Sequence, residues 1–169
     1  MSLKEINVDD LQFNPFTAIG KEWFLVTAGD VKDFNTMTAS WGGVGVMWGK
    51  NVVTTVIRSN RHTYSYIDDG EYFTISFLPE QYKDILSFCG SHSGRDCNKV
   101  EKTGLKPLAV NKAVTFEQAK LVFVCKKLYA QQLSEDCFVD KEQLKWYSKT
   151  NPIHTAFVGE IVATYVQND

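Results

Sequence analysis

The chain has 169 residues and a formal net charge of −2, with 44% hydrophobic and 22% charged residues. These values are typical of one globular domain, here residues 1–169, with a core large enough to fold alone. The charge argues against nucleic acid or an anionic membrane surface as partner. No apolar run is long enough to cross a membrane as a helix, and the first residues show no secretory signal. A mature secreted chain would look the same, but the cysteines are best explained as reduced core residues, which are the norm in the cytosol. We expect a cytoplasmic protein.

Apolar and β-branched runs separated by turn residues predict a mainly β fold with short helices. The last two expected strands are long, and strands of that length bend or bulge when they wrap around a closed barrel. The expected strands are 23–29, 35–41, 44–48, 52–57, 72–78, 121–133 and 154–166.

Four short helices are expected between these strands, each beginning at a residue favoured at a helix start. The last one resembles a capping box formed by Asp140 and Gln143. The expected helices are 60–70, capped by Asn60; 79–90, opened by Pro79; 96–104, capped by Asp96; and 140–147, capped by Asp140.

The last expected strand is apolar on both faces. Ala156 and Val158 share one face with His154, and Phe157 and Ile161 lie on the other. One face packs in the barrel core. The second face needs a cover, which is either a helix or a second subunit.

The four cysteines form no Cys-x-x-Cys motif and no Cys/His cluster, so we expect no metal site. Cys125 lies within an apolar run and is best explained as a small core residue.

Arg58, Arg61 and Thr63 follow the expected strand 52–57 and could surround a small anion. Guanidinium groups match phosphate oxygens, and the first turn of the following helix would add backbone N–H donors. The alternative is an exposed pair of arginines in surface salt bridges, which is the commoner situation for two arginines alone.

The segment from Thr38 to Gly43 contains small residues where a strand usually presents bulky ones. Such a backbone edge can lie against a planar heterocycle and donate N–H groups to its rim. The alternative, that a glycine bulge turns a barrel corner here, is about as well supported.

Ser91 to Lys99 is the most polar segment, and Ser93, Arg95 and Lys99 could reach a phosphate or sugar chain. The alternative is a solvated loop between helices.

His154, at the start of the last strand, could polarise a ring or a carbonyl group. Its alternative is a structural hydrogen bond at a strand end.

No Gly-x-Gly-x-x-Gly or Walker-type loop is present. Taken in order, however, the polar segments resemble the flavin reductase-like family of FMN-binding split-barrel proteins, near its flavoredoxin branch. The resemblance covers about residue 23 to the end of the chain. It rests on the segments 28–30, 34–43, 48–50, 57–63, 91–99 and 153–160.

The resemblance implies a Greek-key split barrel that binds FMN, as a homodimer with sites near the subunit interface. It places His154 near the ring as the catalytic candidate. Ser59 stands where the family often has proline, so this loop loses one fixed φ angle. The implied cofactor-binding residues are Asn35, Met37, Thr38, Ala39, Ser40, Trp41, Arg58, Arg61, Thr63, Ser93, Gly94, Arg95, Asp96 and Lys99.

The function implied by the resemblance is an oxidoreductase that passes electrons from NADH or NADPH to flavin. Two alternatives remain open. One is a flavoredoxin-like carrier that exchanges electrons with a redox protein partner. The other is a split-barrel binding module without turnover.

Overall fold

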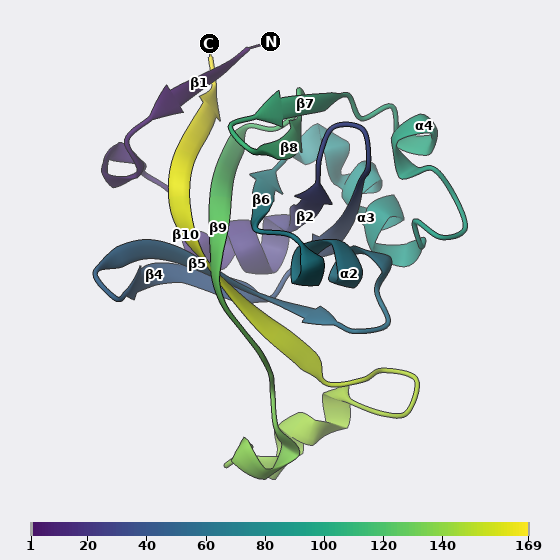
Figure 1. The fold of residues 1–169 in the computed structure, drawn as a ribbon. Helices are drawn as coiled ribbons and strands as arrows, with labels where there is room; N and C mark the ends of the chain where they lie inside the picture. Colours follow the sequence, from purple (N-terminus) through teal and green to yellow (C-terminus); the bar gives the residue numbers. More distant parts are fainter. Residues whose placement is uncertain (1, 169) are drawn as a thin grey trace.

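The computed structural model describes residues 2–168, and its main element is an eight-stranded antiparallel sheet (Figure 1). The prediction of a mainly β fold with short helices is confirmed. A separate hairpin is formed by β7 (Pro107–Val110) and β8 (Ala113–Phe116). The sheet contains β1 (Leu3–Ile6), β2 (Phe24–Gly29), β3 (Phe34–Ala39), β4 (Gly42–Met47), β5 (Lys50–Arg58), β6 (Tyr72–Phe77), β9 (Leu121–Gln132) and β10 (His154–Gln167).

The strand order is β3-β2-β6-β9-β10-β5-β4, with β1 paired to β10 outside this path. The two end strands of the path, β3 and β4, are joined by Ser40 and Trp41 alone. Because neighbours along the chain stand at opposite ends of the order, the sheet curls back on itself as a barrel. The pairing of β10 with β9 shifts register after Val158 and again after Ile161. These irregularities are the bends expected of a long barrel strand.

The helices are short and lie at the ends of strands. One of the segments is a single π-helical turn, η2. The α-helices are α1 (Pro15–Thr17), α2 (His62–Asp69), α3 (Lys83–Ser91) and α4 (Lys99–Thr103). The other helical segments are η1 (Val8–Asp10), η2 (Ala18–Glu22), η3 (Glu80–Tyr82), η4 (Glu135–Cys137) and η5 (Lys141–Trp146).

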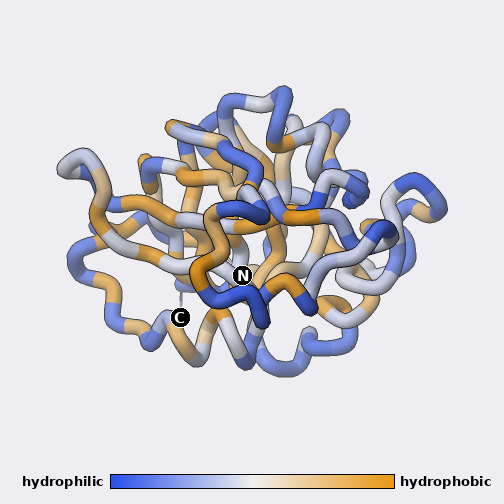
Figure 2. The backbone as a smooth tube through the Cα atoms, turned by 90° about the horizontal axis from the view of Figure 1, so that it is seen from below, coloured by the Kyte–Doolittle hydropathy of each residue, from blue (hydrophilic) through white to orange (hydrophobic). Residues whose placement is uncertain are grey.

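The core has two parts, one on each side of the sheet. Strand β2 shows the division: Phe24 and Val26 face the barrel interior, whereas Leu25 faces the layer formed by α3 and the β7–β8 hairpin. This alternation follows from the two-residue period of a strand. In the tube of Figure 2, apolar stretches run through the interior and many hydrophilic stretches lie on peripheral loops. Cys125 is fully buried, as predicted.

Residues 133–153 form an arm that projects from the barrel between β9 and β10 (Figure 1). Two side chains of the barrel bind its backbone. Arg58 Nη2 donates to the Trp146 carbonyl at 3.1 Å, and Asn60 Nδ2 donates to the Thr150 carbonyl at 3.1 Å. The arm therefore has a fixed attachment to the end of β5.

Two predicted helix starts are wrong. The residue that caps α2 is Arg61, because the side chain of Asn60 is used by the arm. The cap of α4 is Asn98, which accepts hydrogen bonds from the next turn, whereas Asp96 lies in the preceding loop. The end of α4 at Gly104 was predicted correctly. The sequence did not reveal β1, β7 or β8, which are four-residue strands.

In the described part of the chain, no helix has the length and apolar character needed to cross a membrane.

Candidate functional site

A cavity of about 270 Å³ opens where β5, α2 and the end of α3 meet. We call it the cationic cavity, because two arginines line it. Arg61 Nη2 donates to the Gly90 carbonyl at 2.9 Å, so this guanidinium is fixed by backbone and not by a carboxylate. Polar side chains complete the lining of the cationic cavity. The lining residues are Arg58, Asn60, Arg61, His62, Gly90, Ser91, His92, Ser93 and Asn151.

Two unsatisfied features belong to this cavity. The first turn of α2 receives no side-chain cap from Arg61, which leaves backbone N–H groups and the positive end of the helix dipole there. In addition, Arg58 Nε is buried without a hydrogen-bond partner among the described residues. Burial and the nearby charge of Arg58 both lower the pKa of Arg61. Two cations in one cavity repel each other, and a bound anion would relieve that repulsion.

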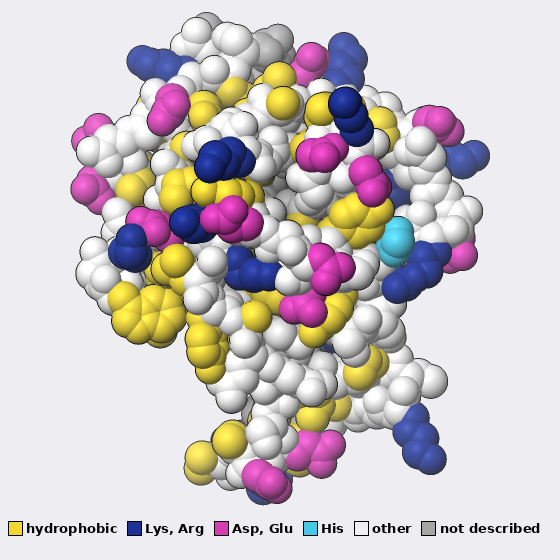
Figure 3. All heavy atoms as spheres, in the orientation of Figure 1, with side chains coloured by type: hydrophobic (Ala, Val, Ile, Leu, Met, Phe, Trp, Pro, Cys, Tyr) yellow, Lys and Arg dark blue, Asp and Glu magenta, His cyan; other side chains and the backbone are white. Residues whose placement is uncertain are grey.

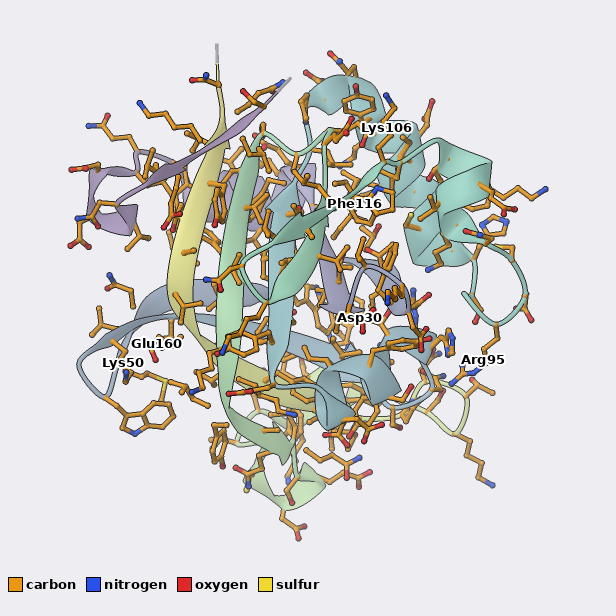
Figure 4. The ribbon with its side chains drawn as sticks, turned by 45° about the horizontal axis from the view of Figure 1, so that its top comes forward. Asp30, Lys50, Arg95, Lys106, Phe116 and Glu160 are labelled. Atoms are coloured by element: carbon orange, nitrogen blue, oxygen red, sulfur yellow. The ribbon has the colours of Figure 1, made fainter. Side chains whose placement is uncertain are left out.

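A second cavity, of about 580 Å³, lies on the other side of the loop 92–98. We call it the lateral cavity. His62 lines both cavities, and Gly94 packs against it and against Asn35. On the face shown in Figure 3, a histidine lies beside basic and apolar side chains. In Figure 4, Arg95 extends from the loop toward the start of α2, where its Nη1 donates to the Asn60 carbonyl at 3.1 Å.

Lys99 lines the lateral cavity from α4, although only 5% of the residue is exposed. Its ammonium donates to the carbonyls of Thr36 and Cys89, each at 2.8 Å. Burial lowers the pKa of Lys99 to about 8, so the group still carries a proton at pH 7. A buried cation bound only to carbonyls keeps most of its charge uncompensated.

Every arginine of the chain lies in this region, at positions 58, 61 and 95. None of the ion pairs within residues 2–168 includes an arginine or Lys99. An example of a pair elsewhere is Lys50 with Glu160, at 2.8 Å on the opposite side of the barrel (Figure 4). The alternative of surface salt bridges for Arg58 and Arg61 is therefore wrong.

An aromatic cluster lies beside the cationic cavity, at the same end of β5, where the arm meets the barrel. His154 pairs with Arg58 across β10 and β5. The imidazole of His154 is 5.2 Å from the ring of Trp41, and Trp41 is 5.3 Å from Trp146 of the arm. Tyr147 Oη lies 3.1 Å from His154 Nδ1. Segments that are far apart in sequence thus form one aromatic surface.

The imidazole of His154 is neutral at pH 7. Burial and the charge of Arg58 lower its pKa to about 4. A neutral imidazole offers one donor and one acceptor, which suits contact with a polar heterocycle better than contact with an anion.

The structure divides the predicted residues into groups. Arg58, Arg61 and Ser93 meet in the cationic cavity. The lateral cavity takes Asn35, Gly94, Arg95, Asp96 and Lys99. Trp41 lies in the aromatic cluster with His154.

The remaining predicted residues do not line these two cavities. Met37 is a core residue, and Thr38 Oγ1 donates to the Leu86 carbonyl at 2.6 Å. Ala39 and Ser40 lie half-buried at the turn from β3 to β4. The hydroxyl of Thr63 is buried and accepts from Asn35 Nδ2 at 2.7 Å, so Thr63 supports Asn35 from inside.

Two residues of the site were not predicted. His62 stands between Arg61 and Thr63, and this position alone could have suggested it. Tyr147 gave no such signal, because the folding of the arm onto the barrel creates its contact with His154.

Residues 17–169 match the family model described as flavin reductase like domain. The chain belongs to this family. No curated protein sequence matches it.

Solved structures share the fold. Flavoredoxin of Desulfovibrio vulgaris (Miyazaki F) is 23% identical with a TM-score of 0.67, over 86% of this chain and 69% of that one. An FMN-binding domain of a flavin reductases-like enzyme from Shewanella baltica OS155 is 15% identical with a TM-score of 0.70, and the match covers 98% of this chain and 77% of that one. A protein with a split barrel domain from Shewanella frigidimarina NCIMB 400 is 20% identical with a TM-score of 0.68, and the match covers 88% of this chain and 68% of that one. The predicted split barrel is thus confirmed.

Proposed function

We propose that this protein binds FMN and is an NAD(P)H-dependent flavin oxidoreductase. One observation carries the FMN assignment: Arg58, Arg61 and Lys99 are fixed by backbone carbonyls and have no carboxylate partner within residues 2–168. Fixed, uncompensated cations beside a helix N-terminus are a site for a phosphate monoester. Family membership and the FMN-binding proteins of the same fold support this choice of ligand.

The proposed arrangement places the phosphate of FMN in the cationic cavity and the ring at the aromatic cluster. Arg58, Arg61 and Ser93, with the first turn of α2, would hold the phosphate and its ribityl chain. The segment 38–41 and His154 would bind the ring, and Gly94, Arg95, Asp96 and Lys99 would close the tail end. Ser59 in place of proline leaves the turn intact, because Arg61 N donates to the Arg58 carbonyl at 3.0 Å.

When bound, FMN supplies the redox chemistry, because it accepts hydride and passes on electrons. The chain supplies position and electrostatics. The aromatic cluster would lie against the ring, and His154 would offer it a neutral N–H donor. Such a donor stabilises developing negative charge without adding a permanent ion.

Anaerobic mixing tests the reaction. The FMN-loaded protein is mixed with NADH or NADPH, and flavin absorbance is followed. Bleaching at a catalytic rate by at least one nucleotide is expected. If neither nucleotide bleaches the flavin but dithionite does, the protein is an electron carrier, as the likeness to flavoredoxins allows. If FMN does not bind, the proposal fails.

We further propose that the protein is a cytoplasmic homodimer. Large apolar side chains are exposed on the β4–β5 hairpin and the neighbouring β9, including Val46, Trp48 and Tyr129. A second copy would cover them. Sedimentation at micromolar concentration should give twice 19.2 kDa, and Trp48→Glu should shift the mass toward one chain. A wild-type mass of one chain would refute the dimer.

All four cysteines are free, which is consistent with a reducing compartment.

A further inference from the structure

Tyr147 is the arm residue that touches the candidate catalytic histidine. Its ring meets the imidazole of His154 nearly edge-on, at 5.5 Å and 75°, and packs against Phe138 at 5.9 Å. Its hydroxyl is 3.1 Å from His154 Nδ1. Within residues 2–168, neither the hydroxyl nor the imidazole has another hydrogen-bond partner.

The direction of this hydrogen bond follows from basicity. The imidazole is neutral, because burial and Arg58 lower its pKa to about 4. One ring nitrogen then carries a proton and the other carries a lone pair. The imidazole lone pair is far more basic than a phenol oxygen, and the hydroxyl proton of Tyr147 has no competing acceptor within the described part of the chain. The hydroxyl therefore donates to Nδ1.

The charge of Arg58 also favours the neutral imidazole. Arg58 lies opposite His154 in the sheet, and its guanidinium carbon is 5.9 Å from the centre of the Tyr147 ring. This cation disfavours an imidazolium. It also donates to the Trp146 carbonyl, which holds the adjacent residue Tyr147 in place.

The geometry assigns Tyr147 as a positioning residue that fixes His154 in the tautomer with its proton on Nε2. The Nε2–H group has no acceptor among the described residues, so it is left for a ligand atom. Such a ligand would present an sp² oxygen or nitrogen at the rim of a heterocycle, beside Trp41. The identity of this ligand as FMN rests on the proposed function, whereas the tautomer does not.

The test is a long-range proton–nitrogen NMR spectrum of uniformly ¹⁵N-labelled protein without added flavin. The spectrum of His154→Gln assigns the signals of His154. In the wild type, Nδ1 should be pyridine-like and Nε2 pyrrole-like. In Tyr147→Phe, which keeps the ring contacts, the two signals should move toward each other as the second tautomer becomes populated. Phe138→Leu is the matched control, because it loosens the arm but retains the hydroxyl, and its tautomer should stay as in the wild type.

A proton on Nδ1 in the wild type overturns the inference, and so does an unchanged tautomer in Tyr147→Phe. A tautomer change in Phe138→Leu equal to that in Tyr147→Phe also overturns it, because arm packing would then be the cause. In the FMN-loaded protein, Tyr147→Phe should slow flavin reduction about two- to tenfold, as expected for the loss of one hydrogen bond, with FMN affinity unchanged. Failure to bind FMN would defeat the proposed function alone, since the spectra without flavin still decide the tautomer.

Discussion

The cationic cavity and the aromatic cluster lie at the two ends of one site and are built differently. In the cavity, guanidinium groups bind backbone carbonyls, as Arg61 does with Gly90. In the cluster, side chains contact side chains, as His154 does with Trp41 and Tyr147. A carbonyl fixes a cation without neutralising it, so the cavity keeps charge for an anion. The cluster keeps its imidazole neutral. We therefore expect the first end to determine affinity and the second to determine chemistry.

The largest expected effect concerns the aromatic cluster. His154→Ala should slow reduction of bound FMN by nicotinamide by about 10²–10⁴-fold, the usual loss when a positioned proton donor or polarising group is removed. FMN affinity should change only a few-fold. Rapid mixing under anaerobic conditions measures the rate. Reduction at wild-type speed would make His154 a structural residue.

The second prediction uses the depressed pKa of His154, which burial and Arg58 lower to about 4. The unfolded chain binds this proton near the ordinary pKa of 6.5, so the folded protein holds fewer protons between these values. Stability should therefore fall as pH drops from 6.5 to 4. Over this range, wild type should lose on the order of 2 kcal/mol more than His154→Gln. Urea unfolding at several pH values measures this, and parallel curves for the two proteins would show that His154 is not held neutral by the fold.

A smaller effect is expected at the loop between the two cavities. A Cβ added at Gly94 would lie 2.0 Å from Asn35 Oδ1 and 3.0 Å from His62 Cδ2. Asn35 is buried and bonded to Thr63, so the loop must shift instead. Gly94→Ala should weaken FMN binding about tenfold, as overpacking of one to three kcal/mol would give. Gly45→Ala is the control, since nothing lies within 4 Å of its added Cβ. Equal affinities for the two variants would remove this loop from the site.

Much of the barrel could be predicted from sequence, because its long strands have apolar runs bounded by turn residues. Strand β10 was expected over 154–166 and spans His154–Gln167. The short strand β8 was missed, although all four of its residues are buried. Four residues, one of them the polar Thr115, give too little pattern to separate a strand from a buried loop. The cap of α2 was misplaced because Asn60 binds the arm, a contact set by tertiary structure.

In the site as well, features of the local sequence could be predicted and contacts between distant segments could not. Arg58 and Arg61 could be paired from sequence because Arg61 follows Arg58 by only three positions, just after the expected strand 52–57. The position of Thr63 behind Asn35 could not be predicted, since the direction of its side chain depends on where α2 begins. Tyr147 was out of reach because local sequence does not show where a 21-residue arm returns to the barrel. Contacts between distant segments are the part of a site that a single sequence specifies least directly.

The central claim is that the cationic cavity holds the phosphate of FMN. Equilibrium titration with FMN and with riboflavin, which lacks the phosphate, tests it in the wild type and in the double variant Arg58→Ala/Arg61→Ala. Lys102→Ala, which removes an exposed cation of α4, is the control. Charge-assisted contacts of about 1.5–3 kcal/mol each predict at least a tenfold loss of FMN affinity in the double variant. Riboflavin should bind wild type and double variant nearly equally. An FMN affinity unchanged by the double substitution would contradict the account.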